Sequence, residues 1–239
     1  MTKYGITSDW HLYHNNILTF CQRLDVMTEE ERVRAIELGP NNRAEKIKYS
    51  DGTIRRMVDA VVDGVNSVLG PDDVLWNLGD VMFGPNNIDH FYALLMEFRQ
   101  RIKCRTINLV WGNHDQKLQW WRNKGGKQKA LTKEQFYTVF NEAHWKFPIK
   151  VNGQKIILDH TANAVWIYNH KGAWHCYGHS HGNFEETREK LFPGAKMIDS
   201  GIDNAHRMGY GYTPFIVEGN LKKFMDAQEG LVLDHHGAR

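Results

Sequence analysis

The sequence has little of three things: cysteine, net charge and long apolar runs. Its three cysteines, Cys21, Cys104 and Cys176, are widely spaced and odd in number, which argues against a disulfide framework and suits reduced thiols in a cytoplasm. The net charge is only +2, so no global polyanion-binding signature exists and any basic surface must be local. No apolar run reaches the roughly 18 residues of a membrane span, and the N-terminus leaves no room for a signal peptide. We therefore expect a cytoplasmic protein that has no membrane partner.

The rest of the composition is that of an ordinary folded domain. Hydrophobic residues make up 41% of the 239 residues, enough for a sizeable core and too many for a disordered chain. We expect one domain over residues 1–225, with a surface insertion at 23–52 and a polar, frayed tail at 226–239. The insertion is the least regular part of the chain, because charged residues crowd it and Gly-Pro and Asp-Gly pairs signal turns.

Hydrophobic periodicity predicts an α/β protein. The clearest helix is the apolar repeat from Ile54 to Leu69, which Gly70-Pro71 ends. In the first half we expect strands at 3–8, 74–78 and 106–110, and further helices at 14–22 and 88–100. This alternation implies parallel strands that are joined by right-handed crossovers.

The second half is predicted to be mostly strands. Asn152-Gly153 is a strong hairpin signal between strands at 145–151 and 154–159. Further short strands are expected at 173–177, 196–199 and 214–218. Two mixed sheets that pack face to face, with helices outside, account for this pattern best.

Four short clusters of histidine, aspartate and asparagine are the most informative feature of the chain. They are Asp9-Trp10-His11, Gly79-Asp80, Gly112-Asn113-His114-Asp115 and Gly178-His179-Ser180-His181. Each follows a predicted strand, and ligands at the carboxyl ends of successive strands of an open α/β sheet converge on one crevice. A single surface histidine is usually only solvated, and one G-H-x-H is a weak signal. Four clusters in this order are not explained in that way.

Imidazole nitrogens and carboxylate oxygens are the usual donors of divalent-metal sites. The clusters supply Asp9, His11, Asp80, Asn113, His179 and His181, and His160, after the strand at 154–159, is the best remaining donor. These donors suffice for two ions, and Asp80 is expected to bridge them with one carboxylate oxygen on each. A nitrogen and oxygen set without thiolate suits Mn²⁺, Fe²⁺, Zn²⁺ or Ni²⁺, with Mn²⁺ as the first choice.

The order D-x-H, G-D, G-N-H-D, H, G-H-x-H resembles the calcineurin-like metallophosphoesterases over about residues 3–220. The runs 7–17 and 160–182 are similar to the small bacterial and phage members of that superfamily. The resemblance implies an α/β fold with a four-layer α/β/β/α sandwich and a dinuclear metal centre. Gly79-Asp80 continues as Val81-Met82-Phe83-Gly84, without the arginine that comes soon after this motif in the protein Ser/Thr phosphatases and diadenosine tetraphosphatases, which argues against that branch. The excursion at 23–52 is longer than the resemblance leads us to expect.

The resemblance also implies a ligand set for each metal ion. One ion would be held by Asp9, His11, Asp80 and His181, and the other by Asp80, Asn113, His160 and His179. His114 would lie beside the scissile phosphate.

The expected mechanism is an in-line phosphoryl displacement in which two cations hold the attacking and leaving oxygens. The nucleophile would be a metal-bridging hydroxide, so no serine or cysteine nucleophile is needed. His114 would act as general acid and protonate the departing alkoxide. Asp115 would accept a hydrogen bond from the other ring nitrogen of His114 and set its orientation.

Clues to the substrate are weaker. Segment 116–129 has five basic residues, no acidic residue and the pair Trp120-Trp121, a composition that can hold phosphates while bases stack. The alternative is a solvated loop in which one tryptophan covers the core. The candidate substrate-binding residues are His14, Arg122, Lys124 and His170.

Three functions remain open at this point. The first is a phosphoesterase that hydrolyses mono- or diesters of a nucleotide or a nucleic-acid end. The second is a phosphomonoesterase or pyrophosphohydrolase of small metabolites. The third, a non-catalytic scaffold of the same fold, is disfavoured because every expected ligand and His114 are present. The oligomeric state is not indicated.

Overall fold

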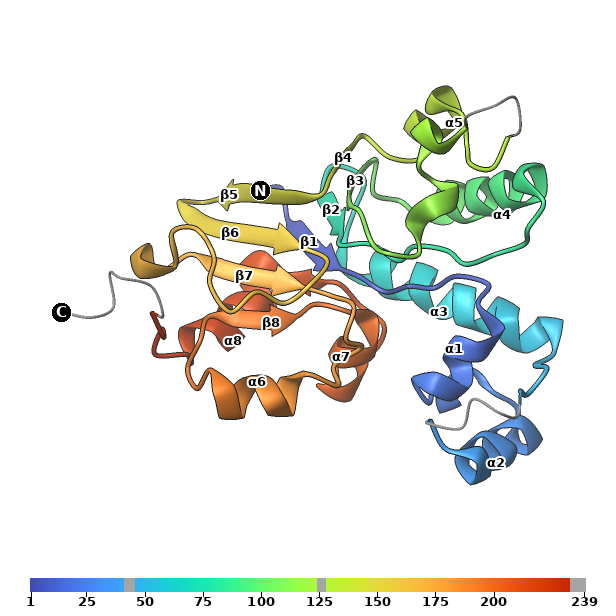
Figure 1. Ribbon diagram of the computed structural model, residues 1–239, viewed down its shortest axis with the longest axis horizontal. Coiled ribbons are helices and arrows are strands. Elements are labelled where there is room, and N and C mark those ends of the chain that lie inside the picture. The colour runs from blue at the N-terminus through green and yellow to red at the C-terminus, as the bar shows by residue number, and fades with distance from the viewer. Residues whose placement is uncertain (41–45, 124–127, 233–239) are drawn as a thin grey trace.

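The computed structural model describes residues 1–40, 46–123 and 128–232, and two β-sheets form its centre (Figure 1). The first sheet has the strand order β4-β3-β2-β1-β9, and the second has the order β5-β6-β7-β8. The strands are β1 (Tyr4–Thr7), β2 (Val74–Asn77), β3 (Thr106–Val110), β4 (Glu142–His144), β5 (Lys146–Val151), β6 (Gln154–Asp159), β7 (Trp174–Tyr177), β8 (Met197–Asp199) and β9 (Phe215–Ile216). Both sheets are mixed, since β9 runs antiparallel to β1 and β5 antiparallel to β6, while the other pairings are parallel.

Helices lie outside the sheets (Figure 1). The α-helices are α1 (Asn15–Phe20), α2 (Glu29–Leu38), α3 (Asp51–Val68), α4 (Ile88–Arg101), α5 (Lys133–Tyr137), α6 (Glu185–Leu191), α7 (Ile202–Arg207) and α8 (Lys222–Asp226). The described residues also form the 3-10 helices η1 (Leu24–Val26), η2 (Asp115–Lys117), η3 (Trp120–Arg122) and η4 (Asn169–Lys171), and the π-helix η5 (Val217–Leu221). Among the described residues, no helix has the length and apolar character needed to cross a membrane.

Three apolar clusters hold these layers together. Ile6, Trp76 and Val110 of the first sheet pack against Ile156 and Cys176 of the second, so the sheets share an inner core. A second cluster joins the outer face of the first sheet to α3 and α4, and a third lies on the outer face of the second sheet beside α6. The predicted α/β fold with two mixed sheets between helices is thereby confirmed.

Local sequence explains why the main elements form where they do. Helix α3 begins after Ser50, whose hydroxyl accepts from the Thr53 N–H, and it buries Met57, Val61 and Val65 along one face. The Asn152-Gly153 turn has φ of +45° and +89°, as a tight hairpin requires, so the predicted β5–β6 hairpin is confirmed.

The predicted surface insertion at 23–52 is more regular than the sequence suggested. Helix α2 occupies ten of its residues and begins with a capping box between Thr28 and Glu31. Only Ala35 of this helix is buried, so hydrophobic periodicity carries almost no signal there. The insertion also does not begin on the surface, because the Arg23 side chain is buried. Residues 41–45 lie outside the described part.

The predicted frayed tail is also partly wrong. Helix α8 crosses the expected boundary at residue 225, and the N–H of Gly230 donates to the Gly194 carbonyl oxygen at 2.8 Å. The Asn169 side chain donates to the Leu231 carbonyl oxygen at 3.0 Å, so the chain is packed through Leu231. The predicted strand at 214–218 shortens to β9, because the chain turns into η5 at Val217. The domain boundaries themselves stay a prediction.

Candidate metal centre

Five strand ends, three in the first sheet and two in the second, deliver the predicted donors to one place. Asp9 and His11 follow β1, Asp80 follows β2, Asn113 follows β3, His160 follows β6, and His179 and His181 follow β7. The first two loops are tied together, since the N–H of Asp9 donates to the Gly79 oxygen at 3.0 Å and that of His11 to the Asp80 oxygen at 2.9 Å. The site therefore lies at the carboxyl ends of parallel strands, as expected for this kind of fold.

The backbone at these residues is unusual. A positive φ, between +46° and +69°, is found at Asp9, His11, Asp80, His179 and His181. Residues other than glycine rarely adopt this backbone conformation. Such conformations cost of order 1–3 kcal/mol each and cluster at functional sites. Their gathering here indicates that the fold is organised around these side chains.

Two glycines allow the Asp80 and Asn113 loops to touch. A Cβ on Gly79 would lie 2.5 Å from the Gly112 Cα, and a Cβ on Gly112 would lie 2.2 Å from the Asp80 Oδ1. Neither distance is compatible with a side chain, so both positions require glycine. The G-D and G-N-H motifs are thus also packing signals.

The first donor group consists of Asp9, His11 and His181, whose ligand atoms lie within 4.8 Å of one another. Asp9 Oδ1 and both ring nitrogens of His11 are buried without a hydrogen-bond partner among the described residues. Burial, followed by the charge of His181, holds the pKa of His11 well below its usual value. Buried polar atoms that lack a partner cost about 1–3 kcal/mol each, and a bound cation would remove that cost.

The second donor group consists of Asp80, Asn113, His160 and His179. Asn113 Oδ1 lies 2.8 Å from His160 Nε2 and 2.9 Å from His179 Nδ1. His160 Nδ1 lies 2.7 Å from the Leu78 carbonyl oxygen, which makes Nδ1 the protonated nitrogen and leaves Nε2 as an acceptor. His160 Nε2 thus faces the Asn113 amide oxygen and the Asp80 carboxylate, and a cation could bind all three atoms.

Asp80 lies between the two groups. Its Oδ2 atom is 3.5 Å from His11 Nε2 and 3.5 Å from His160 Nε2, while its Oδ1 accepts the His114 N–H at 2.7 Å. Burial raises the pKa of this carboxyl group; the charge of His160 opposes that effect and the nearby Asp9 adds to it. The donor chemistry and the partnerless atoms therefore fit two divalent cations with Asp80 between them.

Two residues that the sequence did not reveal hold the first donor group in place. Asp203 Oδ2 accepts from His181 Nδ1 at 2.7 Å, and Arg23 donates to both Asp203 oxygens at 2.8 and 2.9 Å. Arg23 also donates to the carbonyl oxygens of Trp10 and Asp9, each at 2.9 Å. This carboxylate–imidazole contact holds the His181 ring and occupies its Nδ1, which leaves Nε2 for a metal ion. The Cys21 thiol lies within 4.8 Å of Asp203 and His181, but Arg23 already occupies both Asp203 oxygens.

The role predicted for Asp115 is wrong. Its carboxylate accepts the backbone N–H groups of Asp80 and Val81, each at 3.0 Å, and of Gly112 at 2.8 Å, rather than the His114 ring. Burial, followed by the Asp80 charge, raises the pKa of Asp115 to about 6. Asp115 therefore fastens two donor loops together.

Asp199 has the corresponding role for the loop after β7, which carries His179 and His181. It accepts from the Gly182 N–H at 2.8 Å, from the Gly201 N–H at 2.7 Å and from the Ser180 hydroxyl. Burial, followed by the Asp9 charge, raises the pKa of Asp199 to about 7. Its position at the end of a predicted strand was a signal that could have found it.

A cleft of about 580 Å³ opens above the donors and has His114 on its rim. The exposed His114 ring lies 5.5 Å from the His11 ring and 5.7 Å from the Phe83 ring, measured between ring centroids. The predicted substrate residue His14 lines this cleft and stacks on Phe83 at 4.1 Å. Burial, followed by the His114 charge, lowers the pKa of His14 to about 4, so its ring is neutral at pH 7.

Of the other predicted substrate residues, the two that the structure describes, His170 and Arg122, are not brought to this cleft. His170 lies in η4, before the amino end of β7, whereas the donors follow the carboxyl end of that strand. Arg122 lies in η3, and it is not among the described residues that line the cleft. Lys124 lies outside the described residues.

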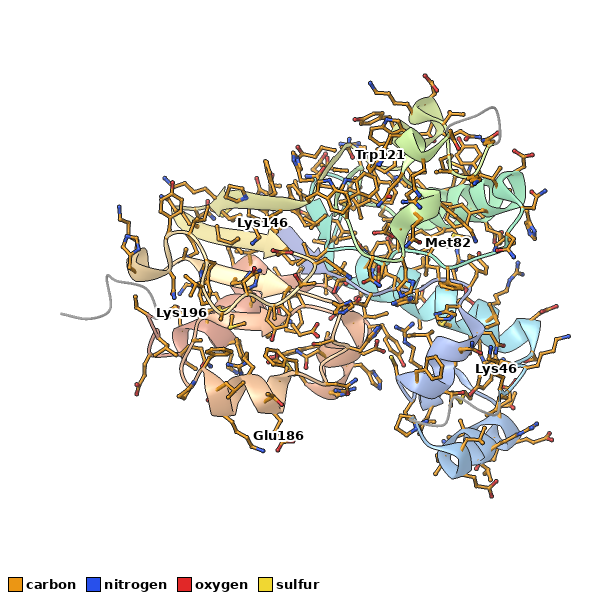
Figure 2. The ribbon with its side chains drawn as sticks, in the orientation of Figure 1. Lys46, Met82, Trp121, Lys146, Glu186 and Lys196 are labelled. Atoms are coloured by element: carbon orange, nitrogen blue, oxygen red, sulfur yellow. The ribbon has the colours of Figure 1, made fainter. Side chains whose placement is uncertain are left out.

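The tryptophan pair near Arg122 belongs to an aromatic cluster. Trp120 and Trp121 pack on Trp111 with ring centroids 6.1 and 5.0 Å away, and Trp120 also packs on Phe136. Figure 2 shows Trp121 beside α5, well separated from Lys46 next to α1. Trp120 packs against the core and Trp121 is 39% exposed, so the alternative in which one tryptophan covers the core is favoured.

Comparison with known proteins decides the family. The sequence profile of the calcineurin-like phosphoesterases matches residues 2–183, a range that contains all four clusters and His160. The chain belongs to this family. Members are metal-dependent phosphoric ester hydrolases, so this calcineurin-like phosphoesterase is an enzyme of that class, and the predicted superfamily is confirmed.

One similar sequence and one similar structure extend the comparison without adding a substrate for this phosphoesterase. The uncharacterized protein MJ1445 of Methanocaldococcus jannaschii is 22% identical over 203 residues, which are 85% of this chain and 83% of that protein. The crystal structure of AQ665, a protein of unknown function from Aquifex aeolicus, has a TM-score of 0.58 at 18% identity. That comparison covers 94% of this chain and 100% of the other. The similarity to AQ665 shows the fold alone.

Proposed function

We propose that this phosphoesterase hydrolyses phosphate mono- or diesters of a nucleotide or a nucleic-acid end at a dinuclear centre, in the cytoplasm. The observation that carries the proposal is the position of Asp80 Oδ2, 3.5 Å from Nε2 of both His11 and His160. A carboxylate equidistant from two donor groups is suited to bridge two cations.

The residues in the two groups would hold the ions. Asp9, His11, Asp80 and His181 would bind one ion, and Asp80, Asn113, His160 and His179 the other. Nitrogen and oxygen donors of this kind suit Mn²⁺ first, and also Fe²⁺, Zn²⁺ or Ni²⁺. When bound, such a pair supplies activated solvent and neutralises charge on the transferring phosphoryl group.

His114 is placed to handle the proton of the leaving group. Its backbone N–H is fixed by Asp80 Oδ1 at 2.7 Å, so its ring position is linked to the bridging carboxylate. The ring is exposed on the rim of the cleft and belongs to neither donor group. We assign it the protonation of the departing alkoxide oxygen, a contribution of about 10²–10⁴ in rate.

The cleft also supports a planar leaving group. Phe83 lines the cleft next to His114 and stacks on His14. Its side chain is still 42% exposed, so part of the ring is available for stacking with a substrate. Aromatic stacking contributes about 1–3 kcal/mol per base in nucleic-acid complexes. This favours a nucleotide over a small aliphatic phosphate.

A screen of the Mn²⁺-supplemented enzyme tests the proposal. The substrates are p-nitrophenyl phosphate, its bis ester, nucleotides, cyclic nucleotides and short oligonucleotides with and without terminal phosphates. We expect Mn²⁺-dependent hydrolysis that EDTA removes, with nucleotides or oligonucleotide ends preferred over glycerol phosphate. Equal rates on all phosphomonoesters would favour the small-metabolite alternative, and no hydrolysis with two bound Mn²⁺ would contradict the proposal.

A further inference from the structure

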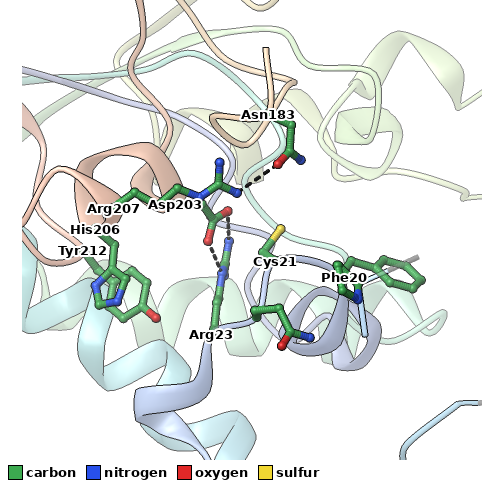
Figure 3. Close-up of a pocket in the computed structure, with 10 residues that line it drawn as sticks. Phe20, Cys21, Arg23, Asn183, Asp203, His206, Arg207 and Tyr212 are labelled. Carbon is green, nitrogen blue, oxygen red and sulfur yellow. Dashed lines mark hydrogen bonds and ion pairs between the residues drawn. The ribbon is translucent and has the colours of Figure 1, made fainter. Parts of the chain in front are cut away.

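A second cavity of about 660 Å³ lies beside the metal cleft (Figure 3). We call it the side pocket. It shares Phe20, Cys21, Pro40 and Asn183 with the cleft, so the two spaces adjoin. A molecule whose phosphate lies at the donor groups can therefore extend into the side pocket.

Most of the charge in the side pocket is already neutralised. Arg23 uses Nε, Nη1 and Nη2 for Asp203 and two backbone carbonyl oxygens, and Asp203 also accepts from His181. Figure 3 shows Arg23 and Asp203 joined to each other below the Arg207 guanidinium. Neither Arg23 nor Asp203 has a charge left for a ligand.

Arg207 is different. Within the described ranges its guanidinium has no carboxylate partner, and its Nη2 donates only to the neutral Asn183 Oδ1, at 3.0 Å. A guanidinium has five N–H donors, so most of them remain for a ligand. Arg207 lies one helical turn after Asp203 in α7, and side chains at this spacing share a face.

The guanidinium also lies close to the metal donors. A Cβ on Gly182, which directly follows His181, would lie 2.9 Å from Arg207 Nη1. Gly182 has a φ of +75°, so the backbone there both needs glycine and leaves room for the guanidinium. The side pocket thus places the Arg207 guanidinium, which has no carboxylate partner among the described residues, against Gly182, the residue that follows the metal donor His181.

A flat wall completes the pocket. The His206 ring lies parallel to the Tyr212 ring, with 4.5 Å between centroids and 6° between planes. The Tyr212 hydroxyl donates to Asp25 Oδ1 at 2.6 Å, which fixes the pair. A planar or sugar-like group can rest against this wall.

From these observations we infer that the side pocket binds the part of the leaving group that extends beyond the metal cleft, and that Arg207 binds a second anionic group on that part, a phosphate or a carboxylate. The inference rests on the proposed phosphoester hydrolysis and narrows its substrate class to doubly anionic compounds. Guanidinium forms charge-assisted, often bidentate hydrogen bonds with both anions, which is the recognition that a lone lysine does not provide.

Two matched substrate pairs test the inference with the Mn²⁺-loaded enzyme. Adenosine 3′,5′-bisphosphate is compared with adenosine 3′-phosphate, and 2-phosphoglycerate with glycerol 2-phosphate. Each pair differs by one anionic group, a phosphate in the first and a carboxylate in the second. We expect a kcat/KM ratio above ten for at least one pair, and which pair shows it identifies the anion. Arg207→Gln should lower that ratio by about tenfold or more, to near one, as loss of a hydrogen bond to a charged group predicts.

A binding measurement separates this inference from the proposed function. Calorimetry of the Mn²⁺-loaded protein compares adenosine 5′-carboxylate, which has no phosphoester bond, with adenosine. Tighter binding of the carboxylate that Arg207→Gln abolishes supports the side-pocket anion site even if no phosphoester is hydrolysed, an outcome that would contradict only the proposed function.

The control is Arg105→Gln, an exposed arginine before β3 at the opposite end of the first sheet. It should change neither the kinetic ratios nor the binding. Ratios near one in the wild-type enzyme, or ratios and binding that Arg207→Gln leaves unchanged, would overturn the inference.

Discussion

At the scale of single residues, Asp80 is the carboxylate that lies against both donor groups. Its two oxygens lie near His11, His160 and the His114 N–H, and its own backbone N–H is held by Asp115. Removing its charge therefore acts on both proposed metal positions, whereas removing any other donor acts on one.

Asp80→Asn should lower the Mn²⁺ content of the purified protein from two equivalents to one or none. The amide keeps the size of the side chain and an oxygen for the His114 N–H, but it supplies no negative charge between two cations. Metal analysis after dialysis measures the content. Asp63→Asn, an exposed change on α3, is the matched control and should keep both ions. Two tightly held equivalents in Asp80→Asn would contradict the bridging role.

His114→Ala should behave in the opposite way, with full metal content and turnover lower by about 10²–10⁴. If His114 protonates the leaving oxygen, the loss must be smaller for p-nitrophenyl phosphate, whose leaving group needs no proton, than for alkyl phosphates. Steady-state kinetics on both substrate types measures this difference. An equal loss on every leaving group would assign His114 to phosphate binding instead.

At the scale of elements, the boundaries of strands were easier to predict than the roles of the residues beyond them. Thr106–Val110 and Gln154–Asp159 were predicted to the residue, because short apolar runs end at glycine or polar clusters. Helix α2 was missed because it buries almost nothing and depends on its capping box. Asp203 could not be found, since it meets Arg23 across 180 residues of sequence and no local pattern encodes that contact.

The capping box of α2 gives a prediction for stability. Glu31 accepts from the backbone N–H of Thr28 and, across to α3, from that of Ser50. Partial burial alone would raise the pKa of Glu31, but hydrogen bonds from Ser50, Thr53 and Thr28 hold it at about 2. A folded-state pKa below the ordinary value of 4.5 means that the ionised form stabilises the fold above that pH.

Glu31→Gln should therefore lower the free energy of unfolding at pH 7 by about 1–2 kcal/mol. The difference from wild type should shrink as the pH falls from 4.5 towards 2, because Glu31 then takes up a proton in the unfolded chain, while folded Glu31 stays ionised until the pH nears 2. Urea unfolding at pH 7 and at pH 3 measures both values. Glu30→Gln, one residue earlier on the exposed side of α2, should change neither. If Glu31→Gln lowers the free energy of unfolding by the same amount at both pH values, the effect comes from the shape of the side chain and not from its charge.

At the scale of the whole molecule, the sequence indicated which side chains converge because strand order and strand ends decide where loops meet. The donors come from two sheets, and the parallel pairings β1–β2, β2–β3 and β6–β7 send their loops in one direction. What the pattern could not supply is the internal support of those loops by Asp115, Asp199 and the Arg23–Asp203 pair. Those contacts depend on three-dimensional packing. They also keep the carboxylates of Asp9, Asp80 and Asp115 close together in the interior, and a bound cation would relieve the repulsion between them.

Metal binding should for that reason stabilise the entire fold. Asp9 Oδ1 and both ring nitrogens of His11 are buried without a hydrogen-bond partner among the described residues, and Asp80 Oδ2 lies 3.5 Å from His11 Nε2. This arrangement forms only in the folded chain, so ions should bind the folded chain far better than the unfolded one. Mn²⁺ at a hundred times its dissociation constant would add about 2.7 kcal/mol, which for a chain of this size raises the melting temperature by about 5–10 °C. Calorimetry of the EDTA-treated protein with added Mn²⁺ measures the shift. Asp63→Asn should show the full shift and Asp80→Asn less than half of it. A wild-type melting temperature that does not respond to Mn²⁺, or an equal response in Asp80→Asn, would show that the ions are not bound by these donors.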